Sequence, residues 1–276
     1  MLRFGPSGIP RSAARPGTAH AIRRIRELGL DCMEMGWVNG VRMRDATADQ
    51  IAESARTHDV ELTAHGPYYV NLCGAPEIVE ASLARLEATA RLGTRCGARS
   101  FCFHAGFHRQ LPSDVVRRRV RHGLRRLTAI TRGARLPIDV RPELTGRASQ
   151  AGSLDEILDW SAAVPGIAPC IDFSHHYARH GGADNRYERF AGMLERVRVR
   201  LGEQALRRLH VHISGIEFGP RGERRHLPLR RSRFRYRELL RALKDMNVEG
   251  WVISESPAQE DDALLLQRTY RRLRRT

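Results

Sequence analysis

The segment that decides the fold is "APCIDFSH", residues 168–175, in which a short apolar stretch ends on Asp172 and is followed by His175. A brief apolar run of this kind predicts a buried strand, here over residues 168–172. A carboxylate and an imidazole placed together at the end of a strand are side chains of the type that bind metal ions. The prediction therefore depends on whether other strands of the chain end in the same way.

Short apolar segments alternate with longer helical patterns along the whole chain. We predict strands at 2–5, 31–36, 60–65, 99–104, 137–142, 168–172, 207–213 and 250–255. Between them we predict helices near 17–28, 46–58, 76–96, 113–132, 153–163, 184–201, 233–246 and 259–273. Eight such units are the number that closes a barrel. With no linker or composition break, residues 1–276 are predicted to form a single domain, an α/β protein with the fold of a (β/α)8 TIM barrel.

Composition excludes several classes of protein. The chain has no run of 18 apolar residues, which excludes a membrane-spanning helix, and its first residues lack the apolar core of a signal peptide. Its five cysteines are odd in number and form no CxxC pair, which indicates reduced thiols rather than a disulfide framework. We therefore expect a cytoplasmic protein that makes no membrane contact and acts as a monomer.

The charge of the chain favours a polyanionic partner. The formal net charge is +16 and the sequence pI is about 10.9. Lys244 is the only lysine among the 47 basic residues. Such a skew toward arginine is typical of a GC-rich genome, so part of the charge reflects composition rather than function.

The predicted strands carry polar residues on one face. Alternate residues of a strand point to opposite sides, so Thr63 and His65 share one face, as do Cys102 and His104 on the next strand. The other face of each strand is apolar and suits contact with the helices. Barrel interiors are normally filled by branched apolar side chains. A polar interior needs partners for its buried groups, and bound metal ions would supply them.

Consecutive strands end on residues that can ligate a metal. At or just after these ends lie Glu34, His65, His104, Glu143, Asp172, His175, His212 and Glu255. Active sites of barrels lie at the C-terminal ends of the strands, and this mixture of ligands suits zinc, manganese or iron. Any one of these histidines alone would be read as a hydrogen-bonded interior residue. Together with several carboxylates that would repel one another without a cation, they predict a metal site at the barrel mouth.

The order of these residues resembles the endonuclease IV family, metal-dependent apurinic/apyrimidinic endonucleases within the xylose-isomerase-like TIM barrels. The resemblance runs over nearly the whole chain. It is carried by five segments in register: "HGPYYVNL" (65–72), "FHAG" (103–106), "PELTGRASQAGS" (142–153), "CIDFSH" (170–175) and "ESP" (255–257).

The resemblance implies a cluster of Zn²⁺ ions, two or three per chain, although Mn²⁺ accepts the same ligands. The implied ligands form three sets: His65, His104 and Glu143 for a first metal; Glu143, Asp172, His212 and Glu255 for a second; and His175 and His226 for a third. The family has an aspartate two residues before the last histidine, where this chain has Arg224. Glu223 is the predicted substitute, one residue away.

The resemblance also implies an activity. The expected reaction is hydrolysis of the phosphodiester 5′ to an abasic site in double-stranded DNA, a step of base-excision repair. Glu143 and Glu255 would act in catalysis, Glu143 as the bridge between the metals and Glu255 in orienting the nucleophile. Tyr68 and Arg42 would contact the DNA, with Tyr68 probing the base stack at the lesion.

Two other functions fit part of the pattern. A xylose-isomerase-like sugar isomerase or epimerase would use a single divalent metal, held by Glu143, Asp172, His212 and Glu255. The presence of His65, His104 and His226 and the high positive charge argue against it, whereas the missing aspartate at Arg224 argues for it. A non-catalytic nucleic-acid-binding barrel is the third alternative, supported only by the altered "GERRH" segment, residues 222–226.

Overall fold

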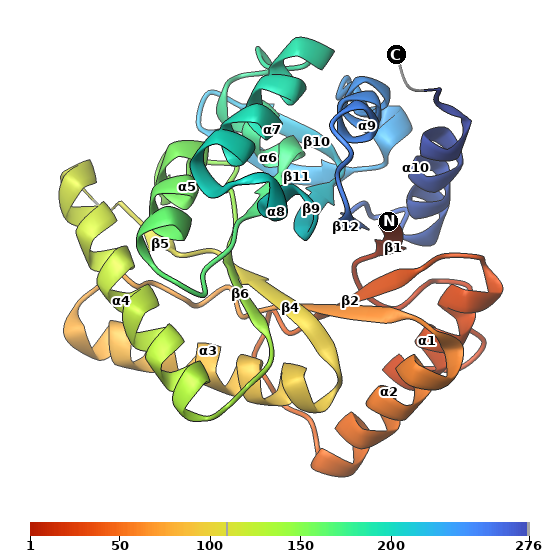
Figure 1. Cartoon of the computed structure of the whole chain (residues 1–276), viewed down its shortest axis with the longest axis horizontal. Helices are drawn as coiled ribbons and strands as arrows, with labels where there is room; N and C mark the ends of the chain where they lie inside the picture. Colours follow the sequence, from red (N-terminus) through yellow and green to blue (C-terminus); the bar gives the residue numbers. More distant parts are fainter. Residues whose placement is uncertain (109, 275–276) are drawn as a thin grey trace.

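Two parallel four-stranded sheets form the centre of the molecule (Figure 1). The computed structural model describes residues 1–108 and 110–274. One sheet has the order β1 (Leu2–Pro6), β12 (Gly250–Ser254), β9 (Leu209–Ile213) and β8 (Cys170–Asp172). The other has the order β2 (Cys32–Gly36), β3 (Glu61–His65), β4 (Ala98–Phe103) and β6 (Asp139–Pro142). All eight predicted strands are present.

The two sheets meet at two seams, where single bridges replace continuous ladders. One seam joins β1 to β2 through a parallel bridge between Ser7 and Glu34. The other joins β6 to β8 through bridges between Val140 and Ile167 and between Glu143 and Cys170. The strands therefore follow one another around a barrel in chain order, as predicted, although the hydrogen-bond ladder is interrupted twice.

A glycine permits the close approach of β1 and β2. A Cβ atom on Gly5 would lie 1.7 Å from the backbone oxygen of Cys32. The neighbouring backbone bonds, from Asp31 N to the oxygen of Phe4 at 3.0 Å and from Gly8 N to the oxygen of Glu34 at 2.8 Å, hold the strands at this spacing. Only glycine fits where backbones pass so closely.

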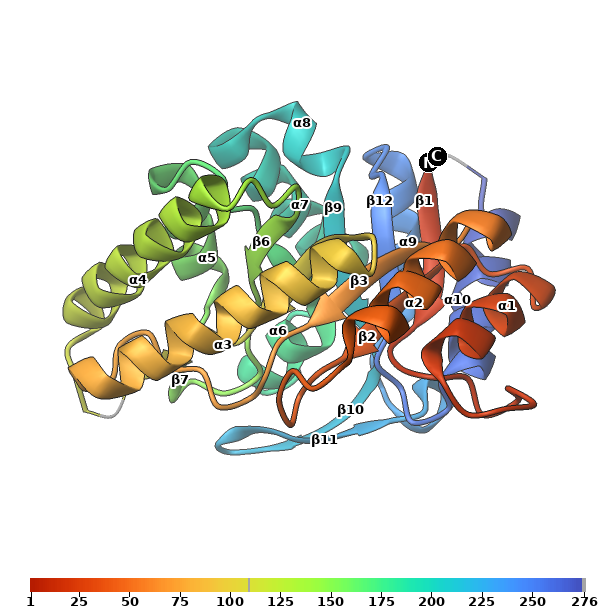
Figure 2. The ribbon, with the colours of Figure 1, turned by 90° about the horizontal axis from the view of Figure 1, so that it is seen from below.

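Helices cover the outer face of the strands (Figures 1 and 2). They are α1 (Thr18–Glu27), α2 (Asp45–His58), α3 (Pro76–Arg95), α4 (Ser113–Gly133), α5 (Leu154–Ala163), α7 (Tyr187–Leu201), α9 (Tyr236–Asp245) and α10 (Glu260–Arg272). Helix α5 begins with a capping box, in which Glu156 N donates to Ser153 Oγ at 3.3 Å and Ser153 N donates to Glu156 Oε2 at 2.8 Å. No described helix is both long and apolar enough to cross a membrane.

Several shorter elements escaped the sequence prediction. Helix α6 (Phe173–Arg179) follows β8 directly, and α8 (Glu203–Leu206) follows α7. The segment between β9 and α9 forms a hairpin of β10 (Gly215–Gly219) and β11 (Gly222–Leu227), followed by the 3-10 helix η1 (Leu229–Arg231). A small pair joins β5 (Gly106–Phe107) to β7 (Gln150–Ala151). The helix predicted from residue 184 begins only at Tyr187.

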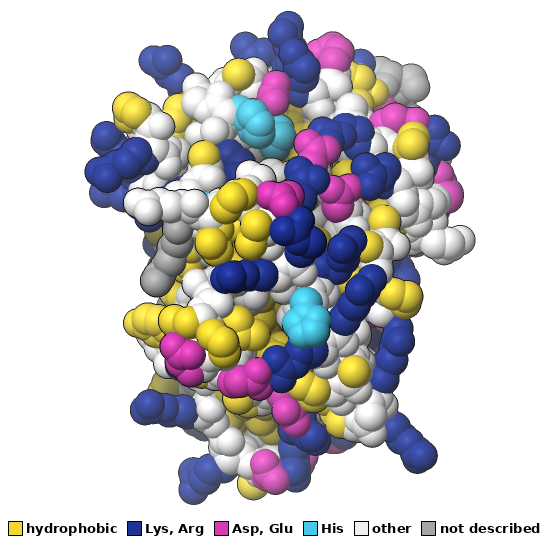
Figure 3. All heavy atoms as spheres, turned by 90° about the vertical axis from the view of Figure 1, so that its left-hand side faces the viewer, with side chains coloured by type: hydrophobic (Ala, Val, Ile, Leu, Met, Phe, Trp, Pro, Cys, Tyr) yellow, Lys and Arg dark blue, Asp and Glu magenta, His cyan; other side chains and the backbone are white. Residues whose placement is uncertain are grey.

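Arginine dominates the charged exterior. On the face shown in Figure 3, basic side chains are spread widely, with acidic side chains interspersed among them. Many are neutralised locally, as in the ion pair of Arg126 with Glu80 at 2.6 Å and that of Arg117 with Asp159 at 2.6 Å. Such exposed pairs contribute little to stability. The excess positive charge is spread over the surface and is partly neutralised by these pairs.

Candidate metal centre

Glu143 lies at the centre of the group of residues at the strand ends. It follows β6 and is fully buried. Its Oε2 atom lies 3.0 Å from Nε2 of His65 and 3.3 Å from Nε2 of His104. Its Oε1 atom lies 3.1 Å from Nδ1 of His212. The two oxygens of one carboxylate therefore face different histidines, contributed by β3 and the end of β4 on one side and by β9 on the other.

Asp172 and Glu255 complete the side that contains His212. Asp172 ends β8 and caps α6, since its Oδ1 accepts a hydrogen bond from the backbone N of His175 at 2.7 Å. Its Oδ2 is buried without a hydrogen-bond partner among the described residues. Glu255 follows β12, and its Oε2 lies 3.5 Å from Nδ1 of His212. One oxygen of Asp172 thus serves the helix, and the other makes no hydrogen bond, with Nδ1 of His175 at 3.4 Å, and could bind a cation.

A third group forms where α6 meets the β10–β11 hairpin. Nε2 of His175 lies 3.4 Å from Nε2 of His226 and 3.4 Å from Oε2 of Glu223. Nε2 of His226 lies 3.6 Å from Oε1 of Glu223. The structure therefore places Glu223 between the two histidines, in the position where the sequence resemblance lacks an aspartate.

A β-bulge explains how Glu223 reaches this position. Residues three apart in a regular strand point to opposite faces, which would separate Glu223 from His226. In the hairpin, however, Glu217 pairs with Arg225 and Phe218 pairs with Glu223, so Arg224 is an extra residue in β11. An extra residue reverses the alternation locally. Arg224 turns its guanidinium to Glu217, at 3.7 Å, and the carboxylate of Glu223 turns inward.

The hydrogen bonds of the histidines indicate which nitrogen is available to a metal. Nδ1 of His65, His175 and His226 each contacts a backbone carbonyl, at 2.8, 2.9 and 3.0 Å respectively. A carbonyl only accepts, so each Nδ1 carries a proton, and Nε2 is the nitrogen that offers a lone pair once the ring is neutral. The Nε2 atoms lie 3.0 to 3.4 Å from carboxylate oxygens or from one another. Zinc ligands 2.0–2.1 Å from a tetrahedral ion lie about 3.4 Å apart, so the residues fit shared cations.

The electrostatics of the group also favour a cation. Burial opposes charge on His65, yet the hydrogen bond from its ring to Glu143 raises its pKa to about 10. Burial would raise the pKa of Glu255, but the charge of His212 lowers it to about 2. Burial raises the pKa of Asp172, and the charges of Glu255 and Glu143 raise it further. Without a metal the carboxylates are neutralised by protons on the histidines, and a bound cation replaces those protons.

Comparison with known proteins identifies the family to which the chain belongs. The model of the xylose isomerase-like TIM barrel family matches residues 22–276. The chain belongs to this family. An uncharacterized protein of Methanocaldococcus jannaschii is 40% identical over 274 residues, which are 99% of this chain and 98% of the relative.

The solved structures that resemble this chain belong to enzymes with different activities. Endonuclease IV from Thermus thermophilus has a TM-score of 0.73 and 20% identity, and the match covers 98% of this chain and 97% of that chain. A D-tagatose 3-epimerase-like protein has a TM-score of 0.72 and 15% identity, covering 98% and 96%. The 3-keto-D-glucoside 4-epimerase of E. coli has a TM-score of 0.71 and 18% identity, covering 97% and 100%. The shared fold therefore does not choose between these activities.

Below the predicted ligands, this xylose isomerase-like barrel contains a second buried layer. Glu34 is fully buried, and its Oε2 lies 3.0 Å from Nε2 of His210 and accepts from Thr63 Oγ1 at 3.0 Å. Its Oε1 lies 3.2 Å from Nε2 of His212. Nδ1 of His210 contacts Ser100 Oγ at 3.1 Å. The sequence marked Glu34 as a strand-end carboxylate but not as a site residue; its position behind His212 supports that ring.

Two buried thiols also lie in this inner layer. Sγ of Cys102 lies 3.7 Å from Nε2 of His212 and 3.7 Å from Oε2 of Glu34. Burial favours the neutral thiol of Cys170, but a hydrogen bond from Cys102 and the charge of His210 lower its pKa to about 6. From the sequence, both cysteines were expected to be reduced thiols, with Cys102 on the polar face of its strand. Their proximity to His210 depends on how the strands pair, which the sequence alone does not give.

Of the two predicted DNA-contacting residues, the structure brings Tyr68 to the site, and Arg42 is exposed. Tyr68 is 53% exposed, and its ring centroid lies 5.7 Å from that of His65 and 6.0 Å from that of His104, which places it at the rim. Arg42 is exposed in the loop between β2 and α2. No described residue forms an ion pair with it.

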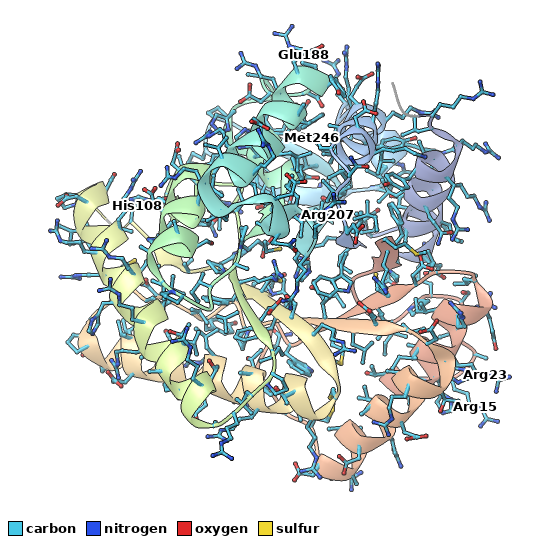
Figure 4. All side chains as sticks on the ribbon, viewed as in Figure 1. Arg15, Arg23, His108, Glu188, Arg207 and Met246 are labelled. Atoms are coloured by element: carbon cyan, nitrogen blue, oxygen red, sulfur yellow. The ribbon has the colours of Figure 1, made fainter. Side chains whose placement is uncertain are left out.

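His108 lies away from the barrel centre (Figure 4), where its Nε2 is 3.4 Å from Oε1 of Glu156.

Proposed function

We propose that the protein is a metal-dependent endonuclease that hydrolyses the phosphodiester 5′ to abasic sites in double-stranded DNA, with Zn²⁺ as its metal. The arrangement of Glu143 carries the proposal: one of its oxygens faces His65 and His104, and the other faces His212. A carboxylate between two separate ligand sets suits a bridge between two cations. Clustered metals are characteristic of enzymes that cleave phosphodiesters.

The residues of the site would divide the work as follows. Bound divalent metals lower the pKa of a water nucleophile and neutralise charge on the attacking and leaving oxygens. Glu143 would hold two of them at a fixed separation. Glu255, whose pKa of about 2 keeps it ionised at neutral pH, would accept a hydrogen bond from the attacking water and orient it. His175, Glu223 and His226 would hold a third cation.

The surface would supply binding to DNA. The net charge of +16 attracts a polyanion and would neutralise its phosphates. Tyr68, at the rim and half exposed, is placed to contact a distorted duplex near the pocket. Because phosphate contacts release counterions, binding to DNA should weaken steeply as the salt concentration rises.

A sugar epimerase is the second candidate. The epimerases of the same barrel, with TM-scores of 0.72 and 0.71, support it. Such an enzyme would need only one cation, held by Glu143, Asp172, His212 and Glu255. It would leave His65, His104 and the His175–Glu223–His226 group without a role. A neutral sugar would also gain nothing from the strong positive charge.

One experiment separates the two candidates. The purified protein, loaded with Zn²⁺ or Mn²⁺, is assayed on a duplex that carries one abasic analogue and in parallel on a panel of ketoses. We expect incision 5′ to the lesion and no epimerisation. Glu143→Gln should lower incision by more than the roughly 100-fold typical for loss of an outer metal-site partner. Glu217→Gln, on the hairpin surface, is the control and should cut normally. An intact duplex with epimerised ketose would overturn the proposal.

A further inference from the structure

Helix α6 carries a second group of potential metal ligands, separate from the barrel mouth. His176 in α6 and His180, the residue that follows the helix, are four residues apart and therefore point to the same side. Their ring centroids are 4.1 Å apart. Asp184, in the loop that leads to α7, places its Oδ2 3.3 Å from Nε2 of His176. One potential ligand atom of each of the three residues lies within 4.8 Å of the others.

The contacts of the group with the rest of the protein use other atoms than the ones that would bind a metal. Nδ1 of His180 contacts the backbone oxygen of His176 at 2.9 Å, so Nδ1 donates and Nε2 is a lone pair. An imidazole fixed in this way by a backbone carbonyl is typical of metal ligands. Arg189 contacts Oδ1 of Asp184 at 3.4 Å, which leaves Oδ2 facing the histidines. Nε2 of His176 is the ring nitrogen that faces Asp184, and Nδ1 of this buried ring has no hydrogen-bond partner among the described residues.

We propose that His176, His180 and Asp184 form an additional site for one transition-metal cation of the Zn²⁺ type. Two imidazoles and a carboxylate are three of the four ligands of a tetrahedral zinc site. The separation of 3.3 Å between His176 and Asp184 matches the roughly 3.4 Å expected for two ligands of one ion. His180 is exposed, so the fourth position would be open to water.

The site is distinct from the barrel mouth although the two share a helix. His175, the neighbour of His176 in sequence, turns its Nε2 toward Glu223 and His226. His176 turns to Asp184 instead. A cation at this second group would tie the C-terminal half of α6 to the loop before α7. It would thereby steady the helix whose first turn carries His175.

The test is metal content of the full-length protein. Wild type and the double variant His180→Ala, Asp184→Asn are saturated with Zn²⁺, desalted and analysed for metal per chain. Both are measured again in the Glu143→Gln background, in which the barrel mouth is impaired. His20→Ala, which removes an exposed histidine of α1, is the matched control. Circular dichroism verifies that each variant is folded.

We expect the double variant to hold one zinc ion fewer per chain than its parent in both backgrounds, and His20→Ala to hold as many as wild type. A deficit that persists with Glu143→Gln would support the α6 site even if the protein proves to be no nuclease. Equal zinc content in parent and double variant would overturn the proposal. In that case the two histidines and the aspartate are a hydrogen-bonded surface group and nothing more.

Discussion

Nε2 of His212 lies 3.2 Å from Oε1 of Glu34, while Nδ1 of the same ring lies 3.1 Å from Oε1 of Glu143. One imidazole therefore connects the buried inner layer of the barrel to the candidate metal centre. The carboxylate of Glu34 is itself held by the hydroxyl of Thr63 at 3.0 Å. Metal-ligating histidines usually donate their other N–H to a carboxylate, which fixes the orientation of the ring.

Replacing Glu34 with glutamine should weaken metal binding without unfolding the protein. Loss of the negative charge removes the acceptor that orients His212, and changes of this kind cost about 10- to 100-fold in metal affinity. Titration calorimetry with Zn²⁺ measures the effect. Glu61→Gln is the control, because Glu61 contacts Arg3 and Trp251 away from the site. Equal affinities for Glu34→Gln and wild type would show that His212 needs no support from Glu34.

Metal binding should release protons. The Glu143 carboxylate raises the pKa of His65 to about 10, and the charge of Asp172 holds the pKa of His175 well above its usual value, in both cases against the effect of burial. Both rings are therefore protonated in the metal-free protein at pH 7, and a metal must displace these protons. Affinity should consequently fall as the pH is lowered.

Proton release is measured by adding Zn²⁺ to chelator-treated protein in weak buffer at pH 7. We expect release of about two protons or more, with the rings of His65 and His175 contributing roughly one each. The variant His65→Asn should release about one fewer. Binding of Zn²⁺ with no change in pH would contradict ligation by these histidines.

Glu223 should act as a metal ligand in place of the missing aspartate. Its carboxylate lies between His175 and His226, at 3.4 and 3.6 Å. Glu223→Ala should therefore reduce the metal content by one ion per chain and slow the reaction. Glu217→Ala is the matched control on the same hairpin, since Glu217 forms ion pairs with Arg224 and Arg225 at the surface. Unchanged metal content and rate in Glu223→Ala would remove Glu223 from the site.

The seam between β1 and β2 should not tolerate a side chain at position 5. In Gly5→Ala the new Cβ would lie 1.7 Å from the oxygen of Cys32, and the strands would have to part. We expect a loss of about 3 kcal/mol or more in the free energy of unfolding, measured by urea denaturation. Gly192→Ala, where a Cβ meets nothing within 4 Å on α7, should be neutral or stabilising by up to about 1 kcal/mol. Similar stability of both variants would contradict the close approach.

The regular parts of the barrel were accessible from sequence because each strand and helix has its own periodicity. The eight strands and the eight long helices follow the predicted ranges closely. The polar face of each strand also followed from alternation, since Thr63, His65 and Cys102 are buried as expected. The proximity of the strand ends then followed from the fold, because parallel strands in a barrel end at one mouth.

The elements that escaped prediction lack such a signal. Helix α6 has seven residues and is buried on nearly all sides, so no apolar stripe distinguishes it from a loop. The β10–β11 hairpin could have been inferred from "GPRG", residues 219–222, as a turn between two alternating segments. The bulge at Arg224 could not, because it depends on cross-strand pairing. It is this bulge that turns Glu223 toward the site.

If Glu143 bridges two cations at the barrel mouth, anomalous diffraction from crystals of the Zn²⁺-loaded protein will locate both. We expect two zinc peaks that share Glu143, one beside His65 and His104 and the other beside His212 and Glu255. A single peak on the His212 side, with His65 and His104 unliganded, would show that Glu143 does not bridge two metals. That result would point to a barrel that works with one metal.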